Sequence, residues 1–271
     1  MTMCELFSLN SEYPADVSFS LDEFKRHGGL SGPHKDGWGI AFYEQYDIRL
    51  IRETDAAATS PCLEFLRHHA YCSSLIISHL RMATSGPVSL PNTQPFCREL
   101  GGRMHLFAHN GDLAGIEKLS GFANGNYHPI GETDSEIAFC HLMKEMQQIW
   151  QEPAQPPALG ERFAVVARFA EKIRPLGPAN FLYADGDFLF AHGHKRTQPG
   201  REGFHPPGLH WLCRSCRLVA ENRLESHHEP GTKSRLQRVA LIASVPLTEE
   251  HWLPFDEGEI MVFGNGSRIL P

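Results

Sequence analysis

The sequence predicts an α+β domain in which helices cover a largely antiparallel system of β-sheets. Three observations predict this fold class. The first 150 residues are rich in short apolar or alternating runs separated by turn residues. Two helical segments follow each other between residues 133 and 174, and the chain then returns to strands. With 271 residues, 41% of them hydrophobic, residues 1–271 are expected to form a single domain.

The first half of the chain is expected to alternate strands with two short helices. Ser20 and Glu23 have the spacing of a capping box, and the glycines at 28–29 supply a helix stop. Ser60 followed by Pro61 is typical of an N-cap with proline at the first helical position. The strands are predicted at residues 4–10, 37–43, 48–52, 74–81 and 105–108.

The second half is expected to hold the two longer helices and the remaining strands. Thr133 and Glu136 have capping-box spacing, and apolar residues recur at helical intervals as far as residue 150. A proline-rich break at 152–160 separates this helix from a second one over 162–174. Strands are predicted at 181–184, 188–191, 209–213, 239–244 and 260–263, and exposed loops at 193–208 and 222–233.

Composition excludes several classes of function. The chain has 25 basic and 32 acidic residues, a net charge of −7, so no nucleic-acid or anionic membrane partner is expected. No apolar run approaches the roughly 20 residues that cross a bilayer, and no signal peptide is visible. The seven cysteines are scattered and odd in number. We therefore expect reduced thiols in a cytoplasmic protein.

Cys4 is the candidate nucleophile. Taken alone, a cysteine near the start of a chain favours a buried strand residue. If Cys4 becomes the first residue, however, its α-amine has a pKa of about 7.7–8.0 and can act as a general base near neutral pH. Nucleophile and base then belong to one residue, and no histidine is required.

Three further segments place polar residues after predicted strands. Arg81 is suited to bind a substrate carboxylate through two parallel hydrogen bonds, and Thr84 follows it closely. Asn110 and Gly111 could supply a side-chain amide and a backbone N–H to an oxyanion hole, although Asn-Gly by itself favours a simple turn. Asp134 would lie in the first turn of a helix, where an ionised carboxylate is favoured and could receive a substrate ammonium group.

Two other patterns favour structural interpretations. Cys213 and Cys216 have redox or zinc spacing, but no second cysteine pair follows, and a strand leads directly into them. His192, His194 and the histidines at 205 and 210 are irregularly spaced. Neither a metal nor a cofactor is expected.

The order of these segments is more specific than any one of them. Cys4, the run His79 to Thr84, the run 92–96, the run His109 to Gly111 and the run 133–136 together resemble the class II glutamine amidotransferases. The motifs lie within residues 4–150, and the segment 32–39 is similar to small stand-alone members of that family. The resemblance implies a four-layer αββα sandwich of the N-terminal nucleophile hydrolase type.

The resemblance also implies a role for each candidate residue. Cys4 would attack the side-chain amide of glutamine, forming a glutamyl thioester and releasing ammonia. Asn110 and Gly111 would hold the oxyanion. The substrate-binding candidates are Arg81 and Thr84 for the α-carboxylate, Asp134 for the α-ammonium, and His109 beside the oxyanion pair.

The sequence departs from the family pattern at two places. Met1 and Thr2 precede Met3-Cys4, whereas the family nucleophile follows the initiator methionine directly, so we expect translation to begin at Met3. Gln94 stands where the family commonly has histidine. No acceptor domain follows the glutaminase-sized region, so ammonia is expected to be released or passed to a separate partner protein.

Three alternatives remain open on the sequence. The chain could hydrolyse a γ-glutamyl amide of a modified small molecule, as relatives in the ergothioneine pathway do. It could be a non-catalytic γ-glutamyl-binding protein whose Cys4 is blocked by residues 1–3. A Cys4 thiolate could instead be activated by His79 or His109, and activity would then survive with residues 1–3 in place.

Overall fold

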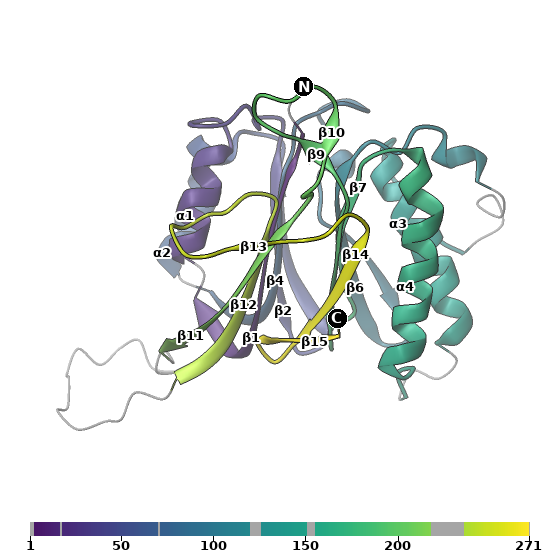
Figure 1. Ribbon diagram of the computed structural model, residues 1–271. Helices are drawn as coiled ribbons and strands as arrows, with labels where there is room; N and C mark the ends of the chain where they lie inside the picture. The colour runs from purple at the N-terminus through teal and green to yellow at the C-terminus, as the bar shows by residue number, and fades with distance from the viewer. Residues whose placement is uncertain are drawn as a thin grey trace.

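Two antiparallel sheets lie face to face between two pairs of helices in the computed structural model (Figure 1). The structure describes residues 3–16, 18–69, 71–119, 126–150, 155–217 and 236–270. Helices α1 (Ser18–His27) and α2 (Pro61–His69) cover one sheet, and α3 (Asp134–Ile149) and α4 (Leu159–Ile173) cover the other. The order of layers is therefore αββα, which confirms the expected fold class.

The first sheet carries the N-terminal strand at its centre. Its seven strands run in the order β13-β11-β12-β1-β4-β2-β3, and every neighbouring pair is antiparallel. β1 (Glu5–Asp16) lies between β12 (Leu236–Ala243) and β4 (Cys72–Leu80). The other strands are β2 (Trp38–Glu44), β3 (Asp47–Glu53), β11 (His210–Arg217) and β13 (Leu253–Pro254).

The second sheet has six strands in the order β15-β14-β8-β7-β6-β5. These strands are β5 (Phe96–Leu100), β6 (Arg103–Gly111), β7 (Ala179–Ala184), β8 (Leu189–Gly193), β14 (Glu259–Gly264) and β15 (Ser267–Leu270). A separate ribbon of β9 (Arg196–Thr197) and β10 (Phe204–His205) lies at the end of the sheets where the chain begins (Figure 1).

Strand alternation divides the apolar side chains among three buried layers. In β1, Phe7 and Leu9 face α1 and α2, whereas Leu6 faces the second sheet. In β6, Phe107 packs under α3 and α4, whereas Leu106 and Ala108 face the first sheet. Because side chains alternate with a period of two, each strand fills two layers at once.

The helix starts follow the caps expected from the sequence. The Ser60 hydroxyl accepts a hydrogen bond from Leu63 N at 3.0 Å, and Pro61 begins α2. The Thr133 hydroxyl accepts from Glu136 N at 3.3 Å at the start of α3. The Glu136 carboxylate does not complete a capping box, because it accepts from Gly131 N and pairs with Arg98 instead.

Some details differ from the prediction. The strands β5 and β15 were not predicted, and α1 begins at Ser18, so that Ser20 lies inside it. The segment 193–208 is exposed at its tip, 199–204, but its base holds the β9–β10 ribbon and the buried Arg196. The other expected loop, 222–233, lies outside the described residues. Among the helices of the described ranges, none is long and apolar enough to cross a membrane.

Candidate functional site

Cys4 lies immediately before β1, opposite the end of β4. Glu5 pairs with Leu80 in the β1–β4 register, and extending that register by one residue sets Cys4 opposite Arg81. Alternation along β1 directs Cys4 to the same face as Leu6, toward the second sheet. The half-buried thiol accepts a hydrogen bond from Met82 N at 3.3 Å and donates to Met82 O at 3.4 Å.

The surroundings of Cys4 keep its thiol protonated. Burial raises the pKa of the Cys4 thiol to about 11. The hydrogen bond to the Met82 backbone and the charge of Arg81 oppose this rise in pKa, whereas the charge of Asp134 adds to it. Since the thiolate is the reactive form, this cysteine needs a base near neutral pH.

Arg81 is fixed by the segment before β2 and by its own loop. Its backbone N donates to Gly37 O at 2.8 Å, and its guanidinium donates to Ser85 O at 3.0 Å and Gly86 O at 3.3 Å through Nη2. The Asp36 carboxylate accepts from Ala83 N at 2.8 Å and so anchors the following turn. The guanidinium has five N–H donors, so these contacts leave some available to a ligand.

Asn110 and Gly111 end β6 with different orientations. The Asn110 side chain is fully buried between the sheets, and its Nδ2 donates to Ser244 Oγ at 3.1 Å. Ser244 Oγ also accepts from Leu6 N at 3.0 Å, which ties Asn110 to β1. Within the described part of the chain, Asn110 Oδ1 is buried without a hydrogen-bond partner.

The backbone N–H of Gly111 points away from β7. Asp112 N donates to Pro178 O at 3.2 Å, so the opposed pair Gly111 and Ala179 is of the type without mutual hydrogen bonds. The N–H of Gly111 therefore lies on the same edge of β6 as the N–H of His109. A side chain could not replace the glycine, because its Cβ would lie 1.8 Å from Pro178 O.

Asp134 is the first residue of α3 and is half-buried. One carboxylate oxygen accepts from Leu113 N at 2.7 Å, and the other accepts from Ser135 N at 2.8 Å. Ser135 Oγ also donates to Oδ1 at 3.4 Å, so Oδ2, the oxygen that accepts from Leu113 N, is the one that retains a lone pair for a further donor. The charge of Asp134 acts on the Cys4 thiol, which places the start of α3 close to Cys4.

The remaining two candidates lie differently from this group. The ring of His109 points to the helix side of the sheet, where it contacts Ser135 Oγ at 2.9 Å and Pro178 O at 3.3 Å. Since Asn110 faces the first sheet, alternation sends the preceding His109 to the other face. Thr84 is exposed in the turn after Arg81.

Gln94 takes a structural position beside β6. Its Oε1 accepts from His109 N at 2.6 Å, and its Nε2 donates to His109 O at 3.2 Å. The side-chain amide thus supplies the two hydrogen bonds that a neighbouring strand would make. This amide holds the last residues of β6 in an extended conformation beyond the end of β5.

In the described ranges, no histidine ring is hydrogen-bonded to the Cys4 thiol. Its Sγ bonds to the backbone of Met82 among the described residues, and the His109 ring faces the helices. Burial lowers the pKa of His79 to about 3, so this ring is neutral at physiological pH. A ring with so low a pKa is a weak base, so among the described residues neither His79 nor His109 is suited to deprotonate Cys4.

Among the described residues, neither of the two discounted patterns forms a disulfide or a metal site. Cys213 and Cys216 are three residues apart on β11 and so point to opposite faces, with Cα atoms about 10 Å apart, too far for a disulfide. His192 is buried, its Nδ1 lies 2.6 Å from Ala179 O, and burial lowers its pKa to about 3. Across the described ranges, no three His, Cys, Asp or Glu side chains are grouped so that they could hold a metal ion.

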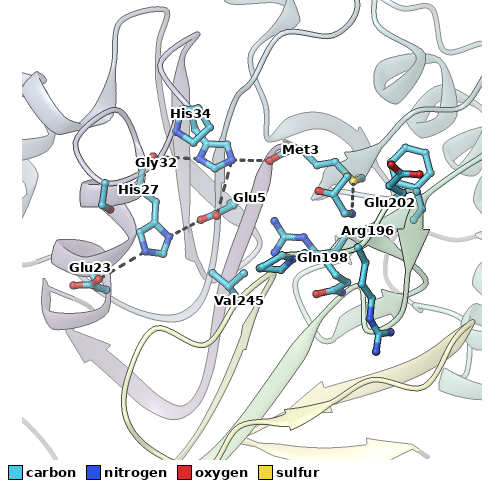
Figure 2. Close-up of a pocket in the computed structure, with 18 residues that line it drawn as sticks. Met3, Glu5, Glu23, His27, Gly32, His34, Arg196, Gln198, Glu202 and Val245 are labelled. Atoms are coloured by element: carbon cyan, nitrogen blue, oxygen red, sulfur yellow. Dashed lines mark hydrogen bonds and ion pairs between the residues drawn. The ribbon is translucent and has the colours of Figure 1, made fainter. Parts of the chain in front are cut away.

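A hollow of about 1020 Å³ adjoins the other side of the Met3–Cys4 backbone. Met3 lines it, together with α1 and the ribbon segment 196–204. Figure 2 shows the contact between His34 and the Met3 carbonyl. His34 Nε2 lies 2.6 Å from Met3 O, and Thr197 N donates to Met3 Sδ at 3.4 Å. Met3 lines this hollow and Cys4 does not.

Two stacked antiparallel sheets between helix pairs, with a cysteine at the start of a central strand, define the N-terminal nucleophile hydrolase class of fold. The sequence model of the family described as "Glutamine amidotransferases class-II" matches residues 3–270. This chain belongs to the class II glutamine amidotransferase family.

Similar proteins span nearly the whole chain. YafJ of Escherichia coli (strain K12), named "Putative glutamine amidotransferase", is 35% identical over 272 residues, which cover 99% of this chain and 100% of YafJ. A "Putative glutamine amidotransferase" of Haemophilus influenzae is 31% identical over an alignment that covers 98% of this chain and 86% of that protein.

Solved structures share the fold. A crystal structure titled as a "predicted glutamine amidotransferase" from Pseudomonas aeruginosa PA01 has 30% identity and a TM-score of 0.68, covering 99% of this chain and 100% of that one. The glutamine phosphoribosylpyrophosphate amidotransferase of B. subtilis has 12% identity and a TM-score of 0.61, with 98% of this chain matching 48% of that one. The latter likeness concerns the fold alone.

The pKa of Cys4 gives a test of its protonation state. With residues 1–3 in place, we expect alkylation of Cys4 by iodoacetamide to rise with pH toward about pH 11, because the thiol is protonated below its pKa. In a protein that begins at Cys4, an additional rise near pH 7.7–8.0 is expected from the α-amine, at roughly its usual pKa. Peptide mass mapping measures both profiles, and identical profiles would contradict this assignment.

Proposed function

We propose that this protein hydrolyses the side-chain amide of glutamine, with Cys4 as nucleophile and its own α-amine as base. The observation that carries the proposal is the convergence of four elements at one end of the two sheets. Cys4 precedes β1, Arg81 follows β4, Asn110 and Gly111 end β6, and Asp134 begins α3. The comparisons supply the family, and these contacts support the individual roles.

The proposed reaction proceeds through a thioester. The α-amine takes the Cys4 thiol proton, and Sγ attacks the amide carbon of glutamine. The C–N bond then breaks, and the α-ammonium returns the proton to the departing nitrogen, which leaves as ammonia. Water, deprotonated by the same amine, attacks the thioester carbonyl, releases glutamate and restores the thiol.

Asn110 and Gly111 would hold the developing oxyanion. The Gly111 N–H points away from β7 and is available on that edge of β6. Turning the Asn110 amide about lets the Ser244 hydroxyl donate to Oδ1, which is otherwise unpartnered in the described structure. Nδ2 would then face the site as a donor. Ser244 is thus a positioning residue for the oxyanion hole.

Arg81 and Asp134 would bind the amino-acid end of the substrate. The unused guanidinium donors of Arg81 suit an α-carboxylate, and Thr84 lies three residues further on in the same turn. The carboxylate of Asp134 suits an α-ammonium group. His109 contacts Ser135 Oγ, so we assign it to holding the first turn of α3, which carries Asp134, in place.

The mechanism requires a free α-amine on Cys4. In the chain with Met3 attached, this nitrogen is a peptide nitrogen and cannot act as a base. We therefore propose that the active form begins at Cys4. None of the seven cysteines, all of which lie in the described residues, forms a disulfide, which supports a reducing compartment such as the cytoplasm. Ammonia would be released or passed to a separate acceptor protein.

Charge removal at the binding residues tests this function. Asp134→Asn and Arg81→Gln are each expected to lower kcat/KM for glutamine about 10- to 100-fold, because each loses a hydrogen bond to a charged group. Asp47→Asn, on the exposed start of β3, serves as the matched control and should leave kcat/KM unchanged. Ammonia release from glutamine measures the effect.

The same assay separates catalysis from simple binding. If the protein only binds γ-glutamyl compounds, the form that begins at Cys4 would bind glutamine but release no ammonia. That outcome, or unchanged kcat/KM in both site variants, would contradict the proposed function.

A further inference from the structure

We propose that the hollow beside Met3 is the subsite for the leaving amine of a γ-glutamyl amide, and that this amine carries a carboxylate. The substrate class is then γ-glutamyl amino acids rather than glutamine alone. This inference rests on the proposed function, because it concerns the leaving-group side of the same reaction.

The chemistry fixes where the leaving group must lie. The departing nitrogen takes its proton from the α-amine of Cys4, so it must come within hydrogen-bonding distance of that amine. The α-amine occupies the position at which the Met3 carbonyl is now attached. Met3 in turn lines the hollow (Figure 2). The leaving group therefore departs toward this hollow.

The size of the hollow exceeds what ammonia requires. Its volume is about 1020 Å³, whereas a molecule the size of water occupies about 30 Å³ in the liquid. Hollows of roughly 300–1,000 Å³ are typical of sites for whole small molecules. An amino-acid leaving group would fit where ammonia would leave most of the space to solvent.

Removal of Met3 leaves hydrogen-bond donors facing the vacated space. Met3 O now lies 2.6 Å from His34 Nε2, and Met3 Sδ accepts from Thr197 N at 3.4 Å. The Nδ1 of His34 is 3.2 Å from His27 O. Once residues 1–3 are gone, His34 Nε2 and Thr197 N lose these acceptors, and a ligand with acceptor oxygens can replace them.

Arg196 supplies the charge that selects a carboxylate. It lines the hollow and is buried, and within the described part of the chain its Nη1 donates to Ser244 O at 2.8 Å. Its Nε is buried without a partner within the described residues. Burial lowers the pKa of Arg196 against the opposing charges of Glu5 and Cys4, which marks a cation that is incompletely compensated.

Three acidic residues line the hollow: histidines engage Glu5 and Glu23, whereas Glu202 is exposed at the tip of the ribbon segment. Glu5 accepts from His27 at 2.7 Å and lies 3.9 Å from His34 Nε2. Glu23 lies 3.7 Å from the other ring nitrogen of His27. A ligand carboxylate would therefore meet its uncompensated partner at Arg196, on the ribbon side of the hollow.

The reaction is balanced without a further reactant. Sγ of Cys4 bonds to the γ-carbonyl carbon, the C–N bond breaks, and the thiol proton reaches the amino-acid nitrogen through the α-amine. Water then cleaves the thioester, which yields glutamate and the free thiol. The products are glutamate and one amino acid.

Two substrates that differ only in the carboxylate test the inference. We would compare kcat/KM for γ-glutamylglycine and γ-glutamylglycinamide, using protein that begins at Cys4. The expected acid-to-amide ratio is about 10 or higher for the unaltered protein. In Arg196→Gln the ratio should fall to about 1, Arg196→Lys should keep an intermediate ratio, and Arg49→Gln, on exposed β3, should change nothing.

Because both substrates are assayed with the same variant, the ratio of their kcat/KM values does not change if part of that protein is unfolded. Glutamine hydrolysis without hydrolysis of γ-glutamylglycine, or an equal ratio in the unaltered and Arg196→Gln proteins, would overturn the subsite and leave the proposed function intact. If neither substrate nor glutamine is hydrolysed, binding of γ-glutamylglycine to the Cys4→Ala protein, measured by calorimetry, tests the subsite instead. Binding that Arg196→Gln weakens about tenfold would uphold the subsite, and no binding would overturn it.

Discussion

Replacing Cys4 with alanine is expected to lower kcat for glutamine hydrolysis by at least about 10⁴-fold, the scale at which removal of a nucleophile abolishes covalent catalysis. The loss follows because no thioester can form, and the polar groups around the thiol cannot substitute for it. Ammonia release by protein that begins at residue 4 measures the effect. Labelling by a glutamine-like diazo-ketone should disappear in parallel.

The matched control for this variant is Cys213→Ala on β11, which removes an exposed thiol. It should retain full activity and full labelling at Cys4. Residual activity of Cys4→Ala within tenfold of the unaltered protein would show that the nucleophile lies elsewhere.

The second large effect is expected at the oxyanion hole. Asn110→Ala should lower kcat by about 10²- to 10³-fold with little change in KM, because the lost donor acts on the transition state rather than on bound glutamine. Steady-state kinetics on glutamine separates the two parameters. A rise in KM with unchanged kcat would assign Asn110 to ground-state binding instead.

The stability of the Asn110→Ala protein has to be measured together with its activity. The Asn110 amide is bonded to Ser244, so its removal is also expected to cost about 1 kcal/mol of folding free energy. Thermal unfolding measures that loss of stability. The activities of the variant and the unaltered protein are then compared at a temperature well below the unfolding transition of both. Asn126→Ala, which removes an exposed amide near α3, is the control and should leave kcat unchanged.

Local sequence signals account for most of the secondary structure. The Thr133 and Ser60 caps, the apolar periodicity of α3 and α4 and the alternating runs of β1, β4 and β6 are properties of short segments, so they could be predicted. The strand β5 could not, because its residues Phe96–Leu100 include two charged side chains and are paired through β6. The end strand β15 likewise depends on β14 for its pairing.

The candidate site likewise combines residues that the sequence identifies with residues that only the fold brings together. Cys4, Arg81, Asn110 and Asp134 belong to motifs that can be found along the sequence. Ser244 and Arg196 carry no such signal, since their contacts with the site reach across separate segments: Ser244 is 134 positions from Asn110. The opposite orientations of His109 and Asn110 could have been foreseen, because neighbours on a strand face opposite sides.

The role of residues 1–3 is the central claim. Met3 is buried, held at its carbonyl by His34 and at its sulfur by Thr197, so it fills space beside Cys4. The proposed base exists only when this residue is gone. Both the reaction and the leaving-group subsite thus depend on one peptide bond, Met3–Cys4.

Intact-mass measurement and N-terminal sequencing of the natively expressed protein, combined with an assay of ammonia release from glutamine, test this claim most directly. We predict that the active protein begins at Cys4, and that a form retaining Met3 releases no ammonia. Full glutaminase activity in a protein whose sequenced N-terminus is Met1, Thr2 or Met3 would contradict the account.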